Sequence, residues 1–264
     1  MLWIGGQITA LNIIIKLIIP SLVCFLVPFF ILRFQIKGKV EKPTLKNSIG
    51  GATPSTAFER KVVFITGIAC MLMVPVFKTL THLPPFMGML IGLGIMWIIT
   101  ELIHSDKDEE DRKNFTVGYV MRKIDTPSIL FFLGILLAIS ALQSTHILND
   151  VAGWMDSTIK NQDAIVMSIG LLSSIVDNVP LVAASMGMYD LSVFPTDHYF
   201  WTFLAYCTGT GGSALIIGSA AGVAAMGLEK IDFIWYLKNI SWLALIGYFS
   251  GAAVYILQHA VFGI

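Results

Sequence analysis

Long apolar stretches recur along the chain with few polar interruptions. A helix needs about 20 apolar residues to cross the hydrocarbon core of a bilayer. Two apolar regions, 164–195 and 199–227, contain polar residues, glycine and proline, so we do not expect them to be plain spans. Five other stretches predict full transmembrane helices, near residues 9–33, 61–80, 84–103, 126–147 and 239–260.

The composition agrees with this pattern. Hydrophobic residues make up 56% of the chain and charged residues 13%, with a mean hydropathy of +0.78. Soluble domains average about half apolar and about a quarter charged residues. The composition therefore excludes an ordinary soluble domain and predicts an all-α, polytopic membrane protein with about five full spans.

The charge is balanced overall but unevenly distributed among the loops. Lysine and arginine gather in segments 33–61 and 107–123, whereas segment 148–163 carries only Lys160. Because loops rich in Lys and Arg stay in the cytoplasm, the first two segments are predicted to be cytoplasmic and the third external. That external segment has apolar residues at helical spacing, which predicts a short helix, either lying in the membrane interface or simply connecting two elements.

The sequence "SSIVDNVPLV" places Asp177, Asn178 and Pro180 inside the first interrupted region. The apolar residues on either side are too few to span a bilayer, so segment 164–195 is predicted to enter the membrane halfway and return as a re-entrant hairpin. Non-helical backbone is tolerated at such a tip only where protein or a wet cavity covers it. Pro180 suits the first turn of the returning helix, where its missing N–H is no loss.

Two interpretations of Asp177 and Asn178 remain open. Either residue could cap the returning helix and have no further role. An ionisable side chain at membrane depth is costly, however, and usually marks an ion or proton pathway. The carbonyl groups at the end of the incoming helix would add partial negative charge to that of Asp177, which suits a cation.

The second interrupted region contains the sequence "TGTGGS". Gly209, Gly211 and Gly212 predict a break in the helix, and Ser213 is a good N-cap for the helix that follows. Thr208, Thr210 and Ser213 offer uncharged oxygens, which small hard cations favour. Alternatively, the small residues only let helices pack closely, as in the GxxxG pairs Gly88–Gly92, Gly218–Gly222 and Gly247–Gly251.

Together these segments resemble a known family. A hairpin with S-x-x-x-D-N-x-P, followed by a glycine-rich broken helix ending in "IGSAAG", is similar to the second repeat of the ion transporter superfamily. "SSIVDNVPLVAAS" and "GTGGSALIIGSAAG" most resemble NhaD-type sodium/proton antiporters of a bacterial cytoplasmic membrane. Members of that superfamily have two inverted repeats, each with one re-entrant hairpin and one broken helix.

The resemblance implies a division of the chain and an ion site. Residues 1–8 would be the tail of a preceding broken helix, 9–124 linking and scaffold spans, and 125–264 the second repeat; the first hairpin and first break would lie outside the chain. The implied ion- and proton-binding residues are Asp177, Asn178, Thr208, Gly209, Thr210, Gly211, Gly212 and Ser213, with Asp177, Asn178 and Ser213 as sodium ligands and Pro180 structural.

The implied mechanism is competition between sodium or lithium and a proton for Asp177, since burial raises a carboxyl pKa and a bound cation lowers it. The ions are substrates, and neither a cofactor, an enzymatic reaction nor nucleic acid is expected. The resemblance also implies a homodimer. Two alternatives stay open: an anion or organic-acid carrier of the same superfamily, and a truncated membrane protein without transport.

Overall fold

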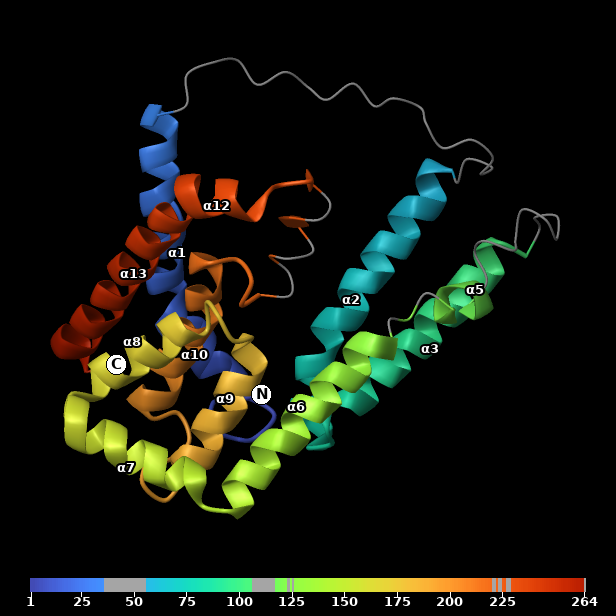
Figure 1. Ribbon diagram of the computed structural model, residues 1–264. Coiled ribbons are helices and arrows are strands. Elements are labelled where there is room, and N and C mark those ends of the chain that lie inside the picture. Colours follow the sequence, from blue (N-terminus) through green and yellow to red (C-terminus); the bar gives the residue numbers. More distant parts are fainter. Residues whose placement is uncertain are drawn as a thin grey trace. The chain divides into compact units, whose positions relative to one another are not determined.

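The computed structural model describes residues 1–35, 56–105, 117–122, 124, 126–219, 222, 225–226 and 229–263, which include helices and no strand. The predicted all-α class is confirmed. Contacts divide the chain into two compact units, residues 1–39 with 131–264 and residues 40–130 (Figure 1). The division of the sequence at residues 8 and 124 follows the family resemblance rather than contacts, and it stays a prediction.

The predicted spans correspond to long helices. Among the described residues, four helices are long and apolar enough to cross a membrane: α1 (Ala10–Gln35), α2 (Ala57–Thr81), α3 (Pro85–Ile103) and α13 (Ser241–Phe262). α6 (Thr126–Ser144) is a helix of 19 residues at the position of the remaining predicted span, 126–147. The basic loops lie mostly at residues 36–55 and 106–116, outside the described part of the chain, so the orientation in the membrane stays a prediction.

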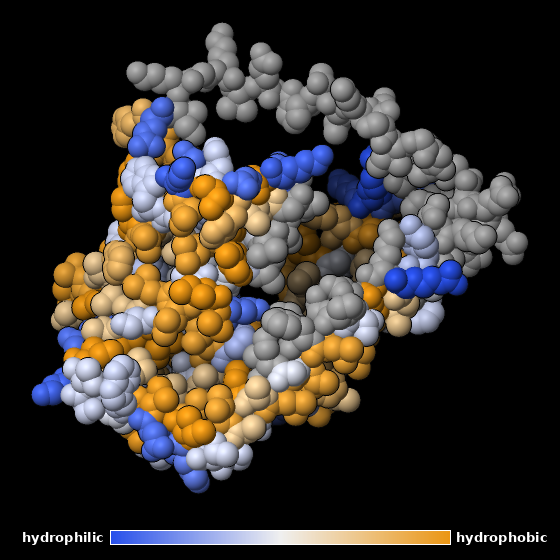
Figure 2. Space-filling view, viewed as in Figure 1, coloured by the Kyte–Doolittle hydropathy of each residue, from blue (hydrophilic) through white to orange (hydrophobic). Residues whose placement is uncertain are grey.

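Apolar side chains cover much of the surface of these helices. On α1, large hydrophobic residues such as Ile14, Ile18, Leu22 and Phe25 are more than half exposed. Figure 2 shows extensive hydrophobic surface on the face in view. Exposed apolar surface of this extent marks contact with a membrane. The protein is therefore a multi-pass membrane protein.

The unit of residues 40–130 is built around the pair α2 and α3, with the short α5 (Val117–Met121) also in its range. Two glycines of α3 face α2. A Cβ on Gly88 would lie 3.1 Å from Cδ1 of Phe77, and a Cβ on Gly92 would lie 3.1 Å from Cβ of Cys70. This GxxxG pair therefore brings two helices of the same chain together.

The other unit is built around α10 (Tyr199–Gly211), which packs against α1, α8, α9 and α13. Its side chains Phe200, Trp201, Phe203 and Leu204 are at most 1% exposed. α10 is hydrophobic or small on every face, as expected for a helix surrounded by others. The centre of this unit is thus one buried helix that ends in a glycine-rich sequence.

α1 and α13 run alongside each other in the same unit (Figure 1). Gly247 and Gly251 of α13 lie against the α1 backbone, where added Cβ atoms would approach the carbonyl oxygens of Cys24 and Pro20. α12 (Phe233–Asn239) precedes α13 and is capped by Asp232, which accepts hydrogen bonds from the Ile234 and Trp235 N–H groups at 3.0 and 3.2 Å. The Gly247–Gly251 pair thus serves helix packing, as predicted.

Candidate ion-binding site

The predicted hairpin consists of two 11-residue helices, α8 (Gln162–Leu172) and α9 (Asn178–Met188), separated by five residues. Both arms contact α7 (Ile147–Ile159), the predicted short helix. α8 starts three residues after α7 ends, and beyond α9 the Tyr189 hydroxyl donates to Asp156 Oδ1 of α7 at 3.2 Å. The chain therefore leaves α7 and returns to it, which is the course of a re-entrant hairpin.

The tip of the hairpin follows the local rules of helix ends. Asp177 is the N-cap of α9, and its Oδ1 accepts a hydrogen bond from the Val179 N–H at 3.3 Å. Pro180 is the third residue of α9, in the first turn, where no intrahelical partner for its missing N–H is needed. The structure therefore shows that Asp177 caps α9. One carboxylate oxygen performs that role, so capping does not exclude cation binding.

The second interrupted region breaks within "TGTGGS", as predicted, because α10 ends at Gly211. α10 remains helical through Gly209 and Gly211, and a short 3₁₀ helix, η1 (Gly212–Ala214), follows. Ser213 lies inside η1 rather than at the start of a helix, so its predicted N-cap role is wrong. The change of direction comes at Ile216, where a β-branched residue has φ +61°, in the left-handed region. Residues 220–221, 223–224 and 227 of the predicted broken helix 199–227 lie outside the described residues.

Gly211 is the glycine of this sequence that packs tightly against another helix. α10 crosses α8 with Gly211 directly against Gly170, and a Cβ on Gly211 would overlap the Gly170 carbonyl oxygen. A Cβ on Gly170 would in turn lie 2.7 Å from Cβ of Cys207. Gly170 and Gly211 therefore permit the close approach of α8 and α10. The α-helix ends at Gly211, and η1 begins at Gly212.

The two breaks meet at one crossing, formed by Ser173 and Ser174 of the hairpin and by Gly212 and Gly218. The Gly218 N–H donates to the Ser174 carbonyl at 3.1 Å, and a Cβ on Gly218 would overlap the Ser173 carbonyl oxygen. A Cβ on Gly212 would lie 3.0 Å from the Gly218 carbonyl oxygen. The non-helical backbone of the hairpin tip and that of residues 212–218 thus cover each other. Non-helical backbone inside a membrane requires such cover by protein.

Ser173 also joins the hairpin to α10. Its side chain is fully buried, and its Oγ donates to the Thr208 carbonyl at 2.9 Å. Ser173 is absent from the predicted site residues, although the S-x-x-x-D-N spacing was the signal that could have found it. This bond places the tip of the hairpin against the last turn of α10.

A cavity of about 290 Å³, here called the central cavity, lies beside this contact. Asn178, Thr208 and Gly209 line it together with Val179 and Val182 of α9 and with residues of the N-terminal segment. The Thr208 hydroxyl donates to the Leu204 carbonyl at 2.7 Å, and its oxygen keeps lone pairs that can accept. The hairpin and α10 therefore each contribute a polar residue to one cavity.

The remaining predicted site residues lie outside the lining of the central cavity. Asp177 adjoins Asn178 in the chain and is partly buried. The Thr210 hydroxyl donates to the Tyr206 carbonyl at 2.7 Å, and Ser213 is exposed. Gly211 lies against Gly170, and Gly212 lies against Gly218, as described above. The described residues contain no group of three His, Cys, Asp or Glu side chains placed for a metal ion.

The N-terminal segment, residues 1–9, completes the cavity. It consists of turns, with Leu2 and Ile8 buried, and Met1, Leu2 and Trp3 line the cavity. Asp197 holds its end: the Thr9 N–H and hydroxyl donate to the two carboxylate oxygens at 2.7 and 2.9 Å. The family resemblance implies that residues 1–8 belong to a preceding broken helix, and it does not predict their contact with the site.

Comparisons with known proteins place the chain among transporters. The profile of a family described as citrate transporter matches residues 2–209. Sodium/proton antiporters 1 and 2 of Arabidopsis thaliana are 47% and 43% identical to it over 98% of this chain. The Na(+)/H(+) antiporter NhaD of Alkalimonas amylolytica is 26% identical, also over 98% of this chain. The matches cover 44%, 61% and 56% of those relatives, respectively, and no solved structure matches.

Proposed function

The chain belongs to the citrate transporter family and resembles its NhaD-type sodium/proton antiporters, and from this we propose that the protein exchanges sodium or lithium for protons across a membrane. The chain spans about half the length of the relatives it matches. The names of those relatives describe antiport by the longer proteins. Antiport by the protein described here is therefore our inference from the family and from the site.

The proposal rests on one observation. The tip of the hairpin and the end of α10 lie against each other, next to an acidic residue. Asn178 of the hairpin and Thr208 of α10 line one cavity, and Asp177 adjoins Asn178. α8 and α10 both end at this crossing, and a helix C-terminus carries partial negative charge. Neutral oxygens, two helix C-termini and one carboxylate favour a small cation over an anion.

In the mechanism we propose, the two ions compete for Asp177. A cation bound near the carboxylate favours its charged form, and loss of the cation inside a low-dielectric site favours protonation. Only one of the two ions is then held at a time, which couples their opposite movements. Asn178 and Thr208 would supply oxygen ligands to the cation, whereas the glycines hold the backbones in place.

Transport of an organic acid is a second candidate, favoured by the description of the matching family. The N-terminus of α9 at the hairpin tip would bind a carboxylate through its free N–H groups. Asp177 occupies this helix end and accepts the Val179 N–H itself. Its negative charge opposes a second anion, so we give preference to the cation.

The finer points of location and assembly are also part of the proposal. A bacterial cytoplasmic membrane, predicted from the resemblance, is supported by the bacterial NhaD relatives, while two matching relatives are plant proteins. A homodimer is proposed on the superfamily resemblance alone. The proposed partners are the lipid bilayer, an inorganic cation and the proton, with no cofactor and no enzymatic reaction.

The test is exchange in sealed vesicles that contain the protein in its full natural length. Sodium or lithium is added to vesicles with a pH gradient, and dissipation of the gradient is followed for the wild type, Asp177→Asn and Asp232→Asn. Asparagine caps helices as well as aspartate does, so both substitutions preserve the caps of α9 and α12. We expect exchange to be lost only in Asp177→Asn.

Two results would contradict the proposal. Exchange that survives in Asp177→Asn would reduce this residue to a helix cap. Folded wild-type protein that carries labelled citrate but does not exchange cations would support the organic-acid carrier instead.

A further inference from the structure

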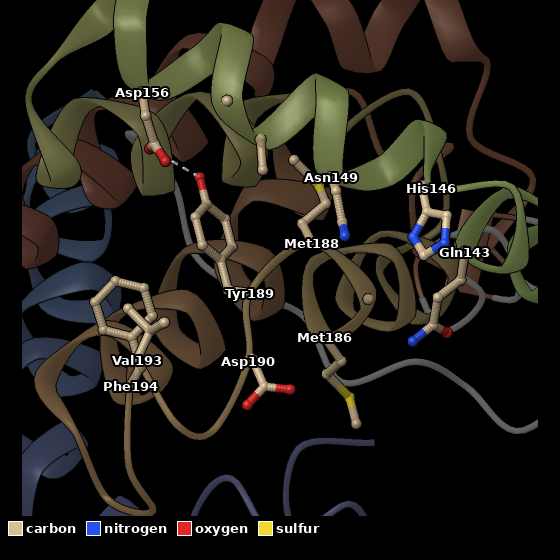
Figure 3. A pocket seen from close by; sticks show the side chains of 13 residues that line it. Gln143, His146, Asn149, Asp156, Met186, Met188, Tyr189, Asp190, Val193 and Phe194 are labelled. Carbon is tan, nitrogen blue, oxygen red and sulfur yellow. Dashed lines mark hydrogen bonds between the residues drawn. The ribbon is translucent and has the colours of Figure 1, made fainter.

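A second cavity, here called the outer cavity, lies at the open end of the hairpin (Figure 3). Its volume is about 610 Å³. One wall comes from the corner between α6 and α7, with Gln143, His146, Asn149 and Asp156. The opposite wall is the end of α9 and the chain that follows it. α7 follows the span predicted to leave the cytoplasm, so this cavity is predicted to face the outside.

The outer cavity carries negative charge. Asp156 and Asp190 line it, and the described residues of its lining include neither lysine nor arginine. The Ser192 N–H donates to Asp190 Oδ1 at 2.7 Å, and this bond lowers the pKa of Asp190. A concave surface with charge of one sign raises the local concentration of counter-ions. Cations are the ions that this cavity would gather.

One face of α9 joins the outer cavity to the central cavity. Val179 and Val182 line the central cavity, and Met186 lines the outer one. The spacings of three and four residues place the three side chains on the same face of the helix. Four residues from Val182 to Met186 correspond to about 6 Å along the helix axis. The two cavities therefore open on the same face of α9, and their nearest lining residues on that face are about one helical turn apart.

Met186 stands between them. Figure 3 shows its side chain directed away from α7. Its methyl group lies against Gly5, where an added Cβ would overlap both Met186 Cε and Gln7 Oε1. Residues 1–3 of the same N-terminal segment line the central cavity. The Met186 side chain thus lies between the outer cavity, which it lines, and the N-terminal segment, whose residues 1–3 line the central cavity.

We propose that the outer cavity is the vestibule through which the cation reaches the central cavity, and that Met186, closed against Gly5 and Gln7, is the gate between them. This inference rests on the proposed antiport function and adds its outer pathway. Methionine is unbranched and flexible, so it can change rotamer without moving the backbone. Because Gly5 has no side chain, the methyl group of Met186 can pack directly against its backbone.

Cysteine labelling tests the pathway without relying on transport. Single cysteines replace Met188, which lines the vestibule, and Val182, which lines the central cavity, in a full-length chain whose native cysteines are replaced. A membrane-impermeant thiol reagent is added from the side predicted to be external. We expect fast labelling at Met188→Cys and slow labelling at Val182→Cys, because the gate separates the two positions.

The gate itself is tested by a second substitution in the Val182→Cys protein. Met186→Ala removes the side chain between the cavities and is expected to raise the labelling rate at Val182→Cys about 10-fold, a change equal to about 1.4 kcal/mol in the opening equilibrium. Met186→Leu keeps the volume and should leave that rate near its original value. Met188→Ala is the matched control on the same helix and should also leave it unchanged.

The outcomes separate the gate from the antiport proposal. Labelling that rises with Met186→Ala supports the gate even if the protein exchanges no cations. If Met186→Ala leaves the labelling rate at Val182→Cys unchanged, Met186 is not the gate. Labelling of Met188→Cys only from the side predicted to be cytoplasmic would also overturn the proposal.

The charge of the vestibule is tested by transport kinetics in a protein that exchanges cations. Replacing both carboxylates, by Asp156→Asn with Asp190→Asn, should raise the apparent KM for sodium severalfold with little change in kcat.

Discussion

The α2–α3 pair and the α8–α9–α10 group differ in where their backbone irregularities lie. α2 and α3 have 25 and 19 residues, each spans without a break, and much of their apolar surface is exposed. α8, α9 and α10 have 11 to 13 residues, and their ends meet at the crossing of Ser173 and Gly218. Unbroken helices need no cover in lipid because their backbone bonds are satisfied internally, whereas broken helices are found only where other protein covers them.

Glycine has a different consequence in the two regions. In α3, a Cβ on Gly88 would meet the ring of Phe77, which is a side chain and can shift. At the crossing, a Cβ on Gly218 would meet the backbone of Ser173, which cannot shift without moving the hairpin. The same residue type therefore adjusts packing in one region and determines the architecture in the other.

Gly218→Ala should have the largest effect. The added methyl group overlaps the Ser173 carbonyl, and we expect a loss of stability at or above the usual cost of overpacking, about 1–3 kcal/mol. Thermal unfolding of the purified full-length protein in detergent measures this, with Gly88→Ala as the matched control. Equal midpoints for the two variants would contradict a backbone crossing at Gly218.

Ser173→Ala should have an intermediate effect. It removes the buried hydrogen bond from Ser173 Oγ to the Thr208 carbonyl, at a cost of about 1 kcal/mol. Because this bond places the hairpin tip against α10, the apparent affinity for sodium should fall as well. Ser168→Ala is the control, since Ser168 Oγ donates to the Ala164 carbonyl within α8 itself. An unchanged apparent affinity for sodium in Ser173→Ala would show that this hydrogen bond does not position the ion site.

Gly88→Ala should have a smaller effect. The new Cβ would sit 3.1 Å from Cδ1 of Phe77, and a small shift of that ring relieves the contact. We expect a loss of less than about 1 kcal/mol, at the lower edge of overpacking costs, and full exchange activity. Abolished exchange in a folded Gly88→Ala protein would show that the α2–α3 pair is part of the ion pathway.

Gly67→Ala should have the smallest effect and the opposite sign. A Cβ on Gly67 of α2 would meet nothing within 4 Å. Alanine is favoured over glycine inside a helix by about 0.5–1 kcal/mol, so the unfolding midpoint should rise slightly. A clear loss of stability would indicate that this face of α2 is packed against protein.

Sequence reasoning was most successful where local rules decide the structure. The lengths of the apolar stretches predicted the spans, and the helix-end preferences of Asp177 and Pro180 predicted the start of α9. It failed where a distant residue decides. Gly211 stays helical because Gly170, 41 positions earlier, leaves room for it, and residues 1–9 are held by Asp197, 188 positions from Thr9.

Binding of sodium to the purified full-length protein tests the central claim most directly. If sodium and a proton compete for Asp177, adding sodium to weakly buffered protein must release protons, which a pH indicator detects. We predict proton release in the wild type and in Asp232→Asn, and none in Asp177→Asn. Proton release of equal size in Asp177→Asn would contradict the claim that this carboxylate exchanges the two ions.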